Sequence, residues 1–146
     1  MPVTETMLRD VVMRTLSDSA FMFPSPTESP IADVELRVRI TFEGPEPGAL
    51  ELGASTGFGR ALAANLLGLE ADDPELDSAS EGALLELSNI MAGLLVEEAW
   101  GSAGCRLGIP ATLDPTTPFP AQAQTFLVDD EFGLVVAIAG PTGGGA

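Results

Sequence analysis

Glu86 and Asn89 place a carboxylate and a carboxamide three residues apart in an apolar segment of the chain. The periodicity of residues 76–100 predicts one long helix, on which side chains three positions apart are neighbours. The chain has no His and no Lys, so carboxylates, amides and hydroxyls are the groups left to do chemistry. These two polar side chains are therefore the first candidates for a functional site.

The helix must turn this pair toward solvent for it to meet a partner. Steps of about 100° per residue put five apolar side chains on one stripe, predicted to be buried: Leu84, Leu87, Met91, Leu94 and Leu95. The same projection puts a second set on the opposite side: Gly82, Glu86, Asn89, Gly93 and Trp100. The pair is predicted to stand on the outer face of the helix.

Gly82 and Gly93 flank the pair on that outer face. Each glycine inside a helix costs about 1 kcal/mol relative to alanine. A helix that gives up this stability keeps room for a close-approaching partner. The alternative is an ordinary solvated face on which the two glycines are incidental, and spacing alone leaves both interpretations open.

Composition excludes several classes of function. The chain has 146 residues, with six Arg against 22 acidic residues and a net charge of −16. Without His there is no Ser-His-Asp triad, and the single Cys forms no intrachain disulfide or CxxC pair. The negative charge disfavours nucleic acid and anionic lipid. The start of the chain does not resemble a signal peptide, so we expect a cytoplasmic protein without a membrane anchor.

Two other motifs have simpler interpretations. Gly57 and Gly59 resemble the start of a dinucleotide fingerprint, but Leu62 stands where the third glycine would be, so turn geometry is favoured. The acidic run 70–75 lacks the pattern of an EF-hand loop and reads as a solvated linker. We predict no metal site and no cofactor held by this chain itself.

The elements around the pair predict an α+β domain with a mainly antiparallel sheet and helices packed on it. Helices are expected at residues 2–20, 57–67 and 76–100, with Phe58, Leu62, Leu66 and Leu67 turned inward on the second. Hairpins are expected at 33–54 and 122–139, with a short strand at 106–109. The polar face of the first hairpin suits a sheet covered on one side only. We expect one domain over residues 1–140, an irregular Pro/Ser-rich connector at 23–31 and a flexible tail at 141–146.

The segment Glu86-Leu-Ser-Asn89-Ile-Met-Ala-Gly93 resembles the Glu-x-x-Asn helix of the CheX/CheC-type chemotaxis phosphatases. The flanking segments 50–68 and 107–110 look like that family's neighbouring strands and helix. A single copy of the motif is similar to the CheX branch, which implies a homodimer. The resemblance also implies the CheC/CheX-like fold for about residues 33–139.

That resemblance implies a phosphatase of bacterial two-component signalling, acting on the aspartyl phosphate of a CheY-type response-regulator receiver domain. Asn89 would direct a water at phosphorus, Glu86 would hold the receiver's lysine, and the receiver would supply Mg²⁺. Gly82 departs from the family's usual Asp or Ser, which leaves a second hypothesis, a non-catalytic module that binds a signalling partner. A third, owing nothing to the resemblance, is an acidic dimeric structural or regulatory domain.

Overall fold

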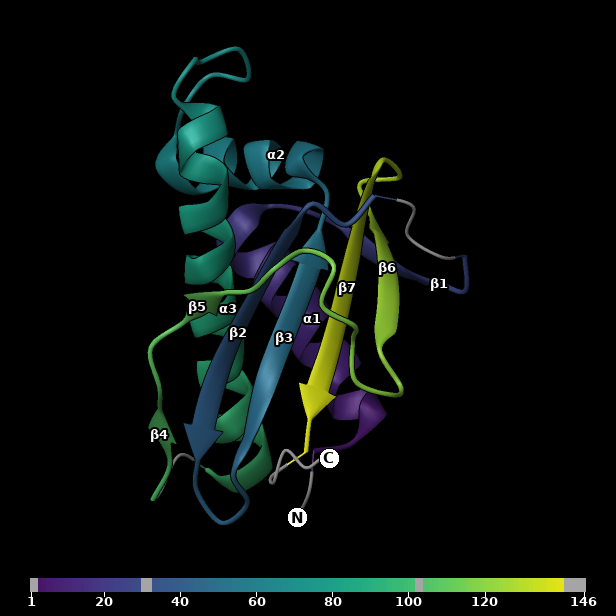
Figure 1. Ribbon diagram of the computed structural model, residues 1–146, viewed down its shortest axis with the longest axis vertical. Helices are drawn as coiled ribbons and strands as arrows, with labels where there is room; N and C mark the ends of the chain where they lie inside the picture. The colour runs from purple at the N-terminus through teal and green to yellow at the C-terminus, as the bar shows by residue number, and fades with distance from the viewer. Residues whose placement is uncertain (1–2, 30–32, 102–103, 141–146) are drawn as a thin grey trace.

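The computed structural model describes residues 3–29, 33–101 and 104–140. Within these residues lie three helices and seven strands, and Figure 1 shows their arrangement. The helices are α1 (Glu5–Ala20), α2 (Thr56–Leu67) and α3 (Leu76–Trp100). The strands are β1 (Pro24–Thr27), β2 (Leu36–Glu43), β3 (Gly48–Ala54), β4 (Arg106–Leu107), β5 (Ala111–Thr112), β6 (Gln124–Val128) and β7 (Phe132–Ala139). The predicted tail at 141–146 lies outside the described residues.

The strands form one antiparallel sheet in the order β1-β6-β7-β3-β2-β4, and β5 also pairs with β2. The predicted hairpins are β2–β3, in register from Leu36 opposite Ala54, and β6–β7. Asp129 and Asp130 connect β6 to β7 with φ of 53° and 57°, left-handed values that Asp tolerates in tight turns. The α+β architecture predicted from the sequence is confirmed.

The helix boundaries follow from capping chemistry. Thr4 Oγ1 accepts the Met7 amide at the start of α1, and Ser55 Oγ accepts the Phe58 amide at the start of α2. α2 ends at Gly68, whose φ of +70° places it in the left-handed region that suits glycine. The three predicted helices are therefore confirmed, with ends that differ from the predicted ones by a few residues at most.

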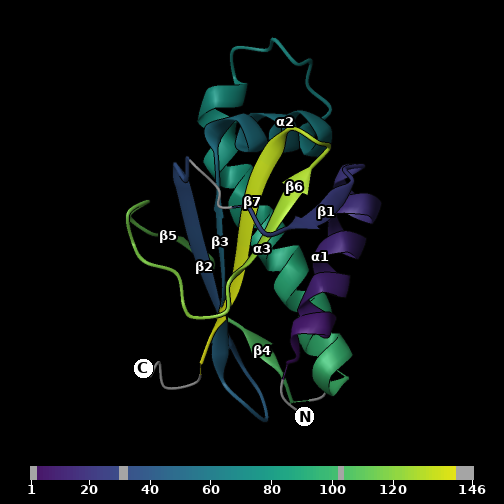
Figure 2. The same cartoon turned by 90° about the vertical axis from the view of Figure 1, so that its right-hand side faces the viewer.

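The helices cover one face of the sheet, as the side view in Figure 2 shows. Their apolar stripes meet the inward side chains of the strands in one core, which includes Leu16 of α1, Leu62 of α2, Leu87 of α3 and Ile40 of β2. α3 is long and apolar enough to cross a membrane by length and composition alone, but half of that window is buried in the protein. It is the central core helix of this fold.

The connector after α1 does not match the prediction of an irregular segment. Residues Pro24–Thr27 form β1, which pairs with β6 from Pro24 opposite Val128 to Thr27 opposite Thr125. β1 is an edge strand, and proline is tolerated there because one side of the strand needs no amide donors. The short β5 was not predicted either.

The sheet face away from the helices is partly covered, contrary to the expectation of a sheet covered on one side only. The chain between β5 and β6 crosses that face, as the green segment in Figure 2 shows. Beneath it, Arg37 has no exposed side-chain surface and Glu51 keeps only 8%. Arg37 Nη2 donates to Glu51 Oε1 at 2.8 Å and to the Pro118 carbonyl at 3.0 Å, while its Cζ lies 3.8 Å from the centre of the Phe119 ring. The buried Arg37 thus pairs with Glu51 within the sheet and ties this loop to the sheet through Pro118 and Phe119.

Candidate functional site

α3 carries the predicted pair, and the rest of the protein holds that helix on both flanks. Its buried face packs into the core, and Arg60 of α2 forms an ion pair with Asp77 in its first turn. Near its other end, Arg14 Nη1 of α1 lies 3.2 Å from Glu98 Oε2. A helix fixed by packing along its length presents its outer side chains in constant positions, which a site for positioned chemistry requires.

Glu86 and Asn89 lie on adjacent turns in the middle of α3. Glu86 is exposed and Asn89 is partly buried. Their buried neighbours are Leu87 and Ser88, and the Ser88 hydroxyl donates to the Leu85 carbonyl at 2.7 Å. Neither member of the pair is enclosed in the core, so a carboxylate and a carboxamide are presented together on a rigid helix.

The two flanking glycines differ in their surroundings. A Cβ built on Gly82 would meet nothing within 4 Å, so this position opens directly to space beside Glu86. A Cβ on Gly93 would lie 3.8 Å from Leu107 Cδ1, which is an ordinary contact with β4. Gly82 therefore leaves an open surface, whereas Gly93 lies beside a short strand.

An apolar groove of about 550 Å³ lies between the end of α2 and the first half of α3. Leu66, Leu67, Ala79, Gly82, Ala83, Glu86 and Ile90 line it. The groove was not predicted from the sequence, because Leu67 was expected to point inward, whereas its side chain is 58% exposed. Steps of about 100° per residue from Phe58 put Leu67 on the opposite side of α2, so that projection would have predicted its exposure.

The helical projection of α3 also fails at its C-terminal end. Leu94 was placed in the buried stripe but is only partly buried. Trp100 was placed on the outer face, yet its ring packs on Phe42 of β2 with centroids 6.0 Å apart. The last turn of α3 thus packs against the sheet through a side chain that the projection assigned to solvent.

Gly59 has a packing role, whereas a Cβ on Gly57 would make only ordinary contacts, the nearest at 3.4 Å from Phe132 Cε1. A Cβ on Gly59 would lie 2.7 Å from Leu36 Cδ1 and 2.9 Å from Ser80 Cβ. Glycine at this position lets α2 approach β2 and α3 closely, which supports the interpretation as local geometry. Among residues 3–29, 33–101 and 104–140, no cluster of three or more His, Cys, Asp or Glu side chains is placed to hold a metal ion.

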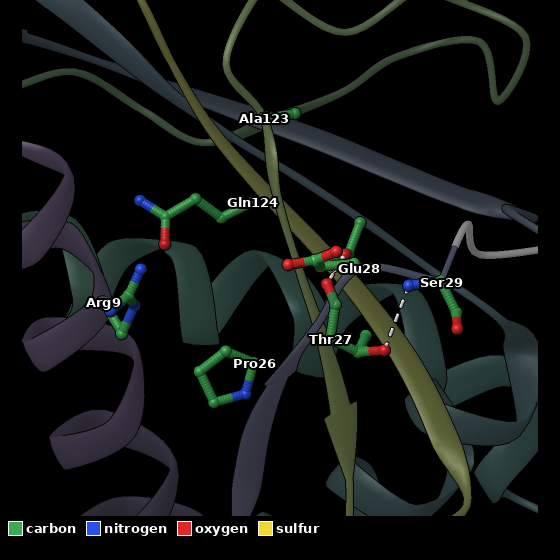
Figure 3. Close-up of a pocket in the computed structure, with 8 residues that line it drawn as sticks. Arg9, Pro26, Thr27, Glu28, Ser29, Ala123 and Gln124 are labelled. Carbon is green, nitrogen blue, oxygen red and sulfur yellow. Dashed lines mark hydrogen bonds between the residues drawn. The ribbon is translucent and has the colours of Figure 1, made fainter.

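A second hollow of about 510 Å³ lies at the opposite edge of the sheet, where α1 faces β1 and β6 (Figure 3). Arg9, Glu28 and Gln124 are among the residues that line it, and Thr27 Oγ1 accepts the Ser29 amide there at 3.1 Å. None of the lining residues belongs to α3. This hollow is therefore separate from the Glu86–Asn89 pair.

Comparison with known proteins identifies the fold. No protein-family model matches the sequence, and no curated protein matches it. The structure of the CheX–CheY–BeF3–Mg complex from Borrelia burgdorferi aligns with a TM-score of 0.69 at 19% identity, covering 94% of this chain and 97% of that one. The chemotaxis protein CheX from Desulfovibrio desulfuricans aligns with a TM-score of 0.66 at 17% identity, covering 91% and 97%. The FliM middle domain from Vibrio alginolyticus aligns at 0.55 and 12% identity, covering 94% and 91%.

The protein thus belongs to the structural class of helices packed on an antiparallel sheet, and its particular fold is that of the CheX- and CheC-like chemotaxis proteins. The matches to the two CheX structures cover 91% and 94% of this chain. The FliM domain has a related arrangement, so the fold alone does not specify a reaction.

Proposed function

We propose that the protein is a CheX-like phosphatase that hydrolyses the aspartyl phosphate of a CheY-type receiver domain. Water attacks phosphorus, the bond between phosphorus and the aspartyl oxygen breaks, and the products are inorganic phosphate and the free carboxylate. The single observation that carries the proposal is the exposed Glu86 and its neighbour Asn89 on the rigid core helix of a CheX-like fold.

Asn89 orients the attacking water in this proposal. Phosphoryl transfer depends mainly on a positioned nucleophile and on neutralised charge, and a side-chain amide supplies the first of these, as the glutamine of GTPases does. Asn89 is partly buried, and its neighbour Ser88 is fully buried. Packing at this point of the helix limits the freedom of the carboxamide and lowers the entropy lost when it holds a water.

Glu86 holds a lysine of the receiver and so fixes how the two proteins dock. The exposed carboxylate is free to reach out from α3 toward a partner's ammonium group. This chain contains no Lys. The lysine, the aspartyl phosphate and a Mg²⁺ ion that neutralises the phosphoryl oxygens all belong to the receiver in this proposal. The Borrelia structure contains CheX together with CheY, BeF3 and Mg, which supports a receiver as the partner class.

The second candidate function is binding without catalysis, and Gly82 is the observation that favours it. Gly82 supplies no side chain one turn before Glu86, and the space above it is open. A receiver domain would then dock on α3 while its phosphate decays at the intrinsic rate.

We also propose that the protein is a homodimer, which equilibrium sedimentation of the full chain tests.

The decisive experiment measures the decay of a phosphorylated receiver. CheY-type receivers are phosphorylated with acetyl phosphate and Mg²⁺, freed of excess donor, and followed with and without this protein. We expect the wild type to accelerate the decay of the phosphorylated receiver. The Asn89→Ala variant should reduce that acceleration about 100-fold or more. Glu97→Gln is the matched control, because Glu97 is an exposed carboxylate elsewhere on α3.

Each result separates the candidates. Decay that the wild type accelerates and Asn89→Ala does not supports the phosphatase. Receiver binding with unchanged decay contradicts it and selects the binding module. Equal rates for the wild type and Asn89→Ala contradict the role of Asn89, even when the rate itself is raised.

A further inference from the structure

The groove beside Glu86 is a second feature of the same surface. It combines apolar walls from Leu66, Leu67 and Ile90 with one carboxylate, that of Glu86. A volume of about 550 Å³ lies inside the range of about 300–1,000 Å³ that is usual for binding pockets. Leu67 lies at the rim of the groove and is 58% exposed to solvent. An occupant of the groove would bury this apolar side chain.

The stretch of chain that joins the two helices of the groove carries only negative charges. It follows Leu67, which ends α2, and continues into the first turns of α3, which hold Ala79. Residues 68–81 contain only acidic charges: Glu70, Asp72, Asp73, Glu75, Asp77 and Glu81. Among these acids, Asp77 pairs with Arg60, and Glu81 directly precedes the lining residue Gly82 in the chain. A cationic occupant is favoured there.

This charge selects among the occupants of an apolar groove. A second copy of the chain seated through the same face would bring the same acidic residues together, and like charges across an interface are costly. A basic segment with a protruding apolar side chain complements both the walls and the rim. Glu86 belongs to the groove and to the proposed docking pair, so one partner can meet both surfaces.

We propose that the groove receives an apolar side chain from a basic segment of the receiver domain, next to the lysine that Glu86 holds. This inference rests on the proposed function and adds the feature that selects the partner. Gly82 is the specificity-determining residue, because the missing side chain keeps the groove open toward Glu86. A larger residue at position 82 fills the space meant for the partner.

The test measures binding with variants that fold. A Cβ at Gly82 meets no atom within 4 Å, so Gly82→Leu lengthens a side chain into open space while it improves helix propensity. Leu67→Arg adds a cation to the exposed rim and repels a basic partner. Phe23→Ala is the matched control, since Phe23 is 70% exposed and does not line the groove. Thermal melting by circular dichroism checks that each variant is folded.

Affinity is measured by calorimetry against a panel of CheY-type receivers, including that of Borrelia burgdorferi, activated with beryllofluoride and Mg²⁺. We expect Gly82→Leu and Leu67→Arg each to weaken binding about tenfold or more, and Phe23→Ala to change it less than about twofold. Raised salt is expected to weaken wild-type binding, because it screens the exposed acidic side chains of residues 68–81.

The outcomes keep this inference apart from the proposed phosphatase. Wild-type affinity in both groove variants, with receiver hydrolysis intact, overturns the groove and leaves the phosphatase standing. Binding that both variants weaken, without any hydrolysis, supports the groove and contradicts the phosphatase. A wild type that binds no receiver in the panel overturns both.

Discussion

Replacing Arg37 by Met is expected to cause the largest loss of stability among the charged residues described in the structure. The Arg37 side chain is fully buried and donates to Glu51 Oε1 at 2.8 Å. It also donates to the Thr117 and Pro118 carbonyls, at 3.3 and 3.0 Å. Met keeps the aliphatic volume but leaves a nearly buried carboxylate and two carbonyls without this donor.

The size of the effect follows from that geometry. Removing one partner of a buried ion pair costs about 3–5 kcal/mol, because the remaining charge stays desolvated. Arg39 compensates little, since its Nε lies 3.7 Å from Glu51 Oε2 and its side chain is 41% exposed. For a domain of this size, that loss lowers Tm by about 10 °C and the urea midpoint by about 2 M.

The assay is urea unfolding followed by circular dichroism, with Arg39→Met as the matched control. The control removes an Arg from the same strand whose link to Glu51 is long and exposed, so it is expected to cost less than about 1 kcal/mol. The double variant Arg37→Met/Glu51→Leu is expected to recover at least half of the loss. A cost below about 1 kcal/mol for Arg37→Met, or equal costs for the two single variants, would refute this reasoning.

Three further predictions use other parts of the molecule. Gly82→Ala is expected to stabilise the fold by about 1 kcal/mol, while Gly59→Ala destabilises it by about 1–3 kcal/mol, because the added methyl has space only at the first position; thermal melting distinguishes them. Hydrogen bonds from the Thr56 amide and hydroxyl lower the pKa of Glu35 below its ordinary value of 4.5, so the stability that Glu35 adds is present above that pH and is lost as the pH falls through the lowered pKa. The stability difference between the wild type and Glu35→Gln should therefore shrink below about pH 4.5 in acid unfolding curves, and a constant difference contradicts the assignment. Carbodiimide should cross-link Glu86 to a receiver lysine, and peptide mass spectrometry with Glu86→Gln as control would locate the bond.

Local patterns in the sequence were enough to predict most of the fold. Alternation predicted β2, and the helical pattern of residues 57–67 predicted α2, whereas the N-cap Ser55 emerged only from the structure. β1 was missed because β6, the strand with which it pairs, follows about 100 residues later in the chain. The two prolines in this segment predict an irregular loop when only local sequence is considered. At the edge of a sheet, however, proline is tolerated in a strand.

The candidate site was found from the sequence only as far as one helix allows. Spacing placed Glu86 and Asn89 on one face of α3, and the structure places them on adjacent turns. The groove needs α2 beside α3, and burial of Arg37 needs a distant loop to cross the sheet. These features depend on tertiary contacts that the periodicity of a single element does not contain.

Trp100, whose ring packs against Phe42, is the single indole of the protein. The chain has one Trp and no Tyr, so emission excited at 295 nm comes from one indole at the C-terminal end of α3. Eleven residues separate it from Asn89, which is about 16 Å along the helix axis. A receiver docked at the proposed site would leave that ring in place, whereas unfolding would expose it. Steady-state emission of this indole, measured on each variant alone, therefore reports the fold, so a variant that keeps native emission but binds no receiver has lost only the partner.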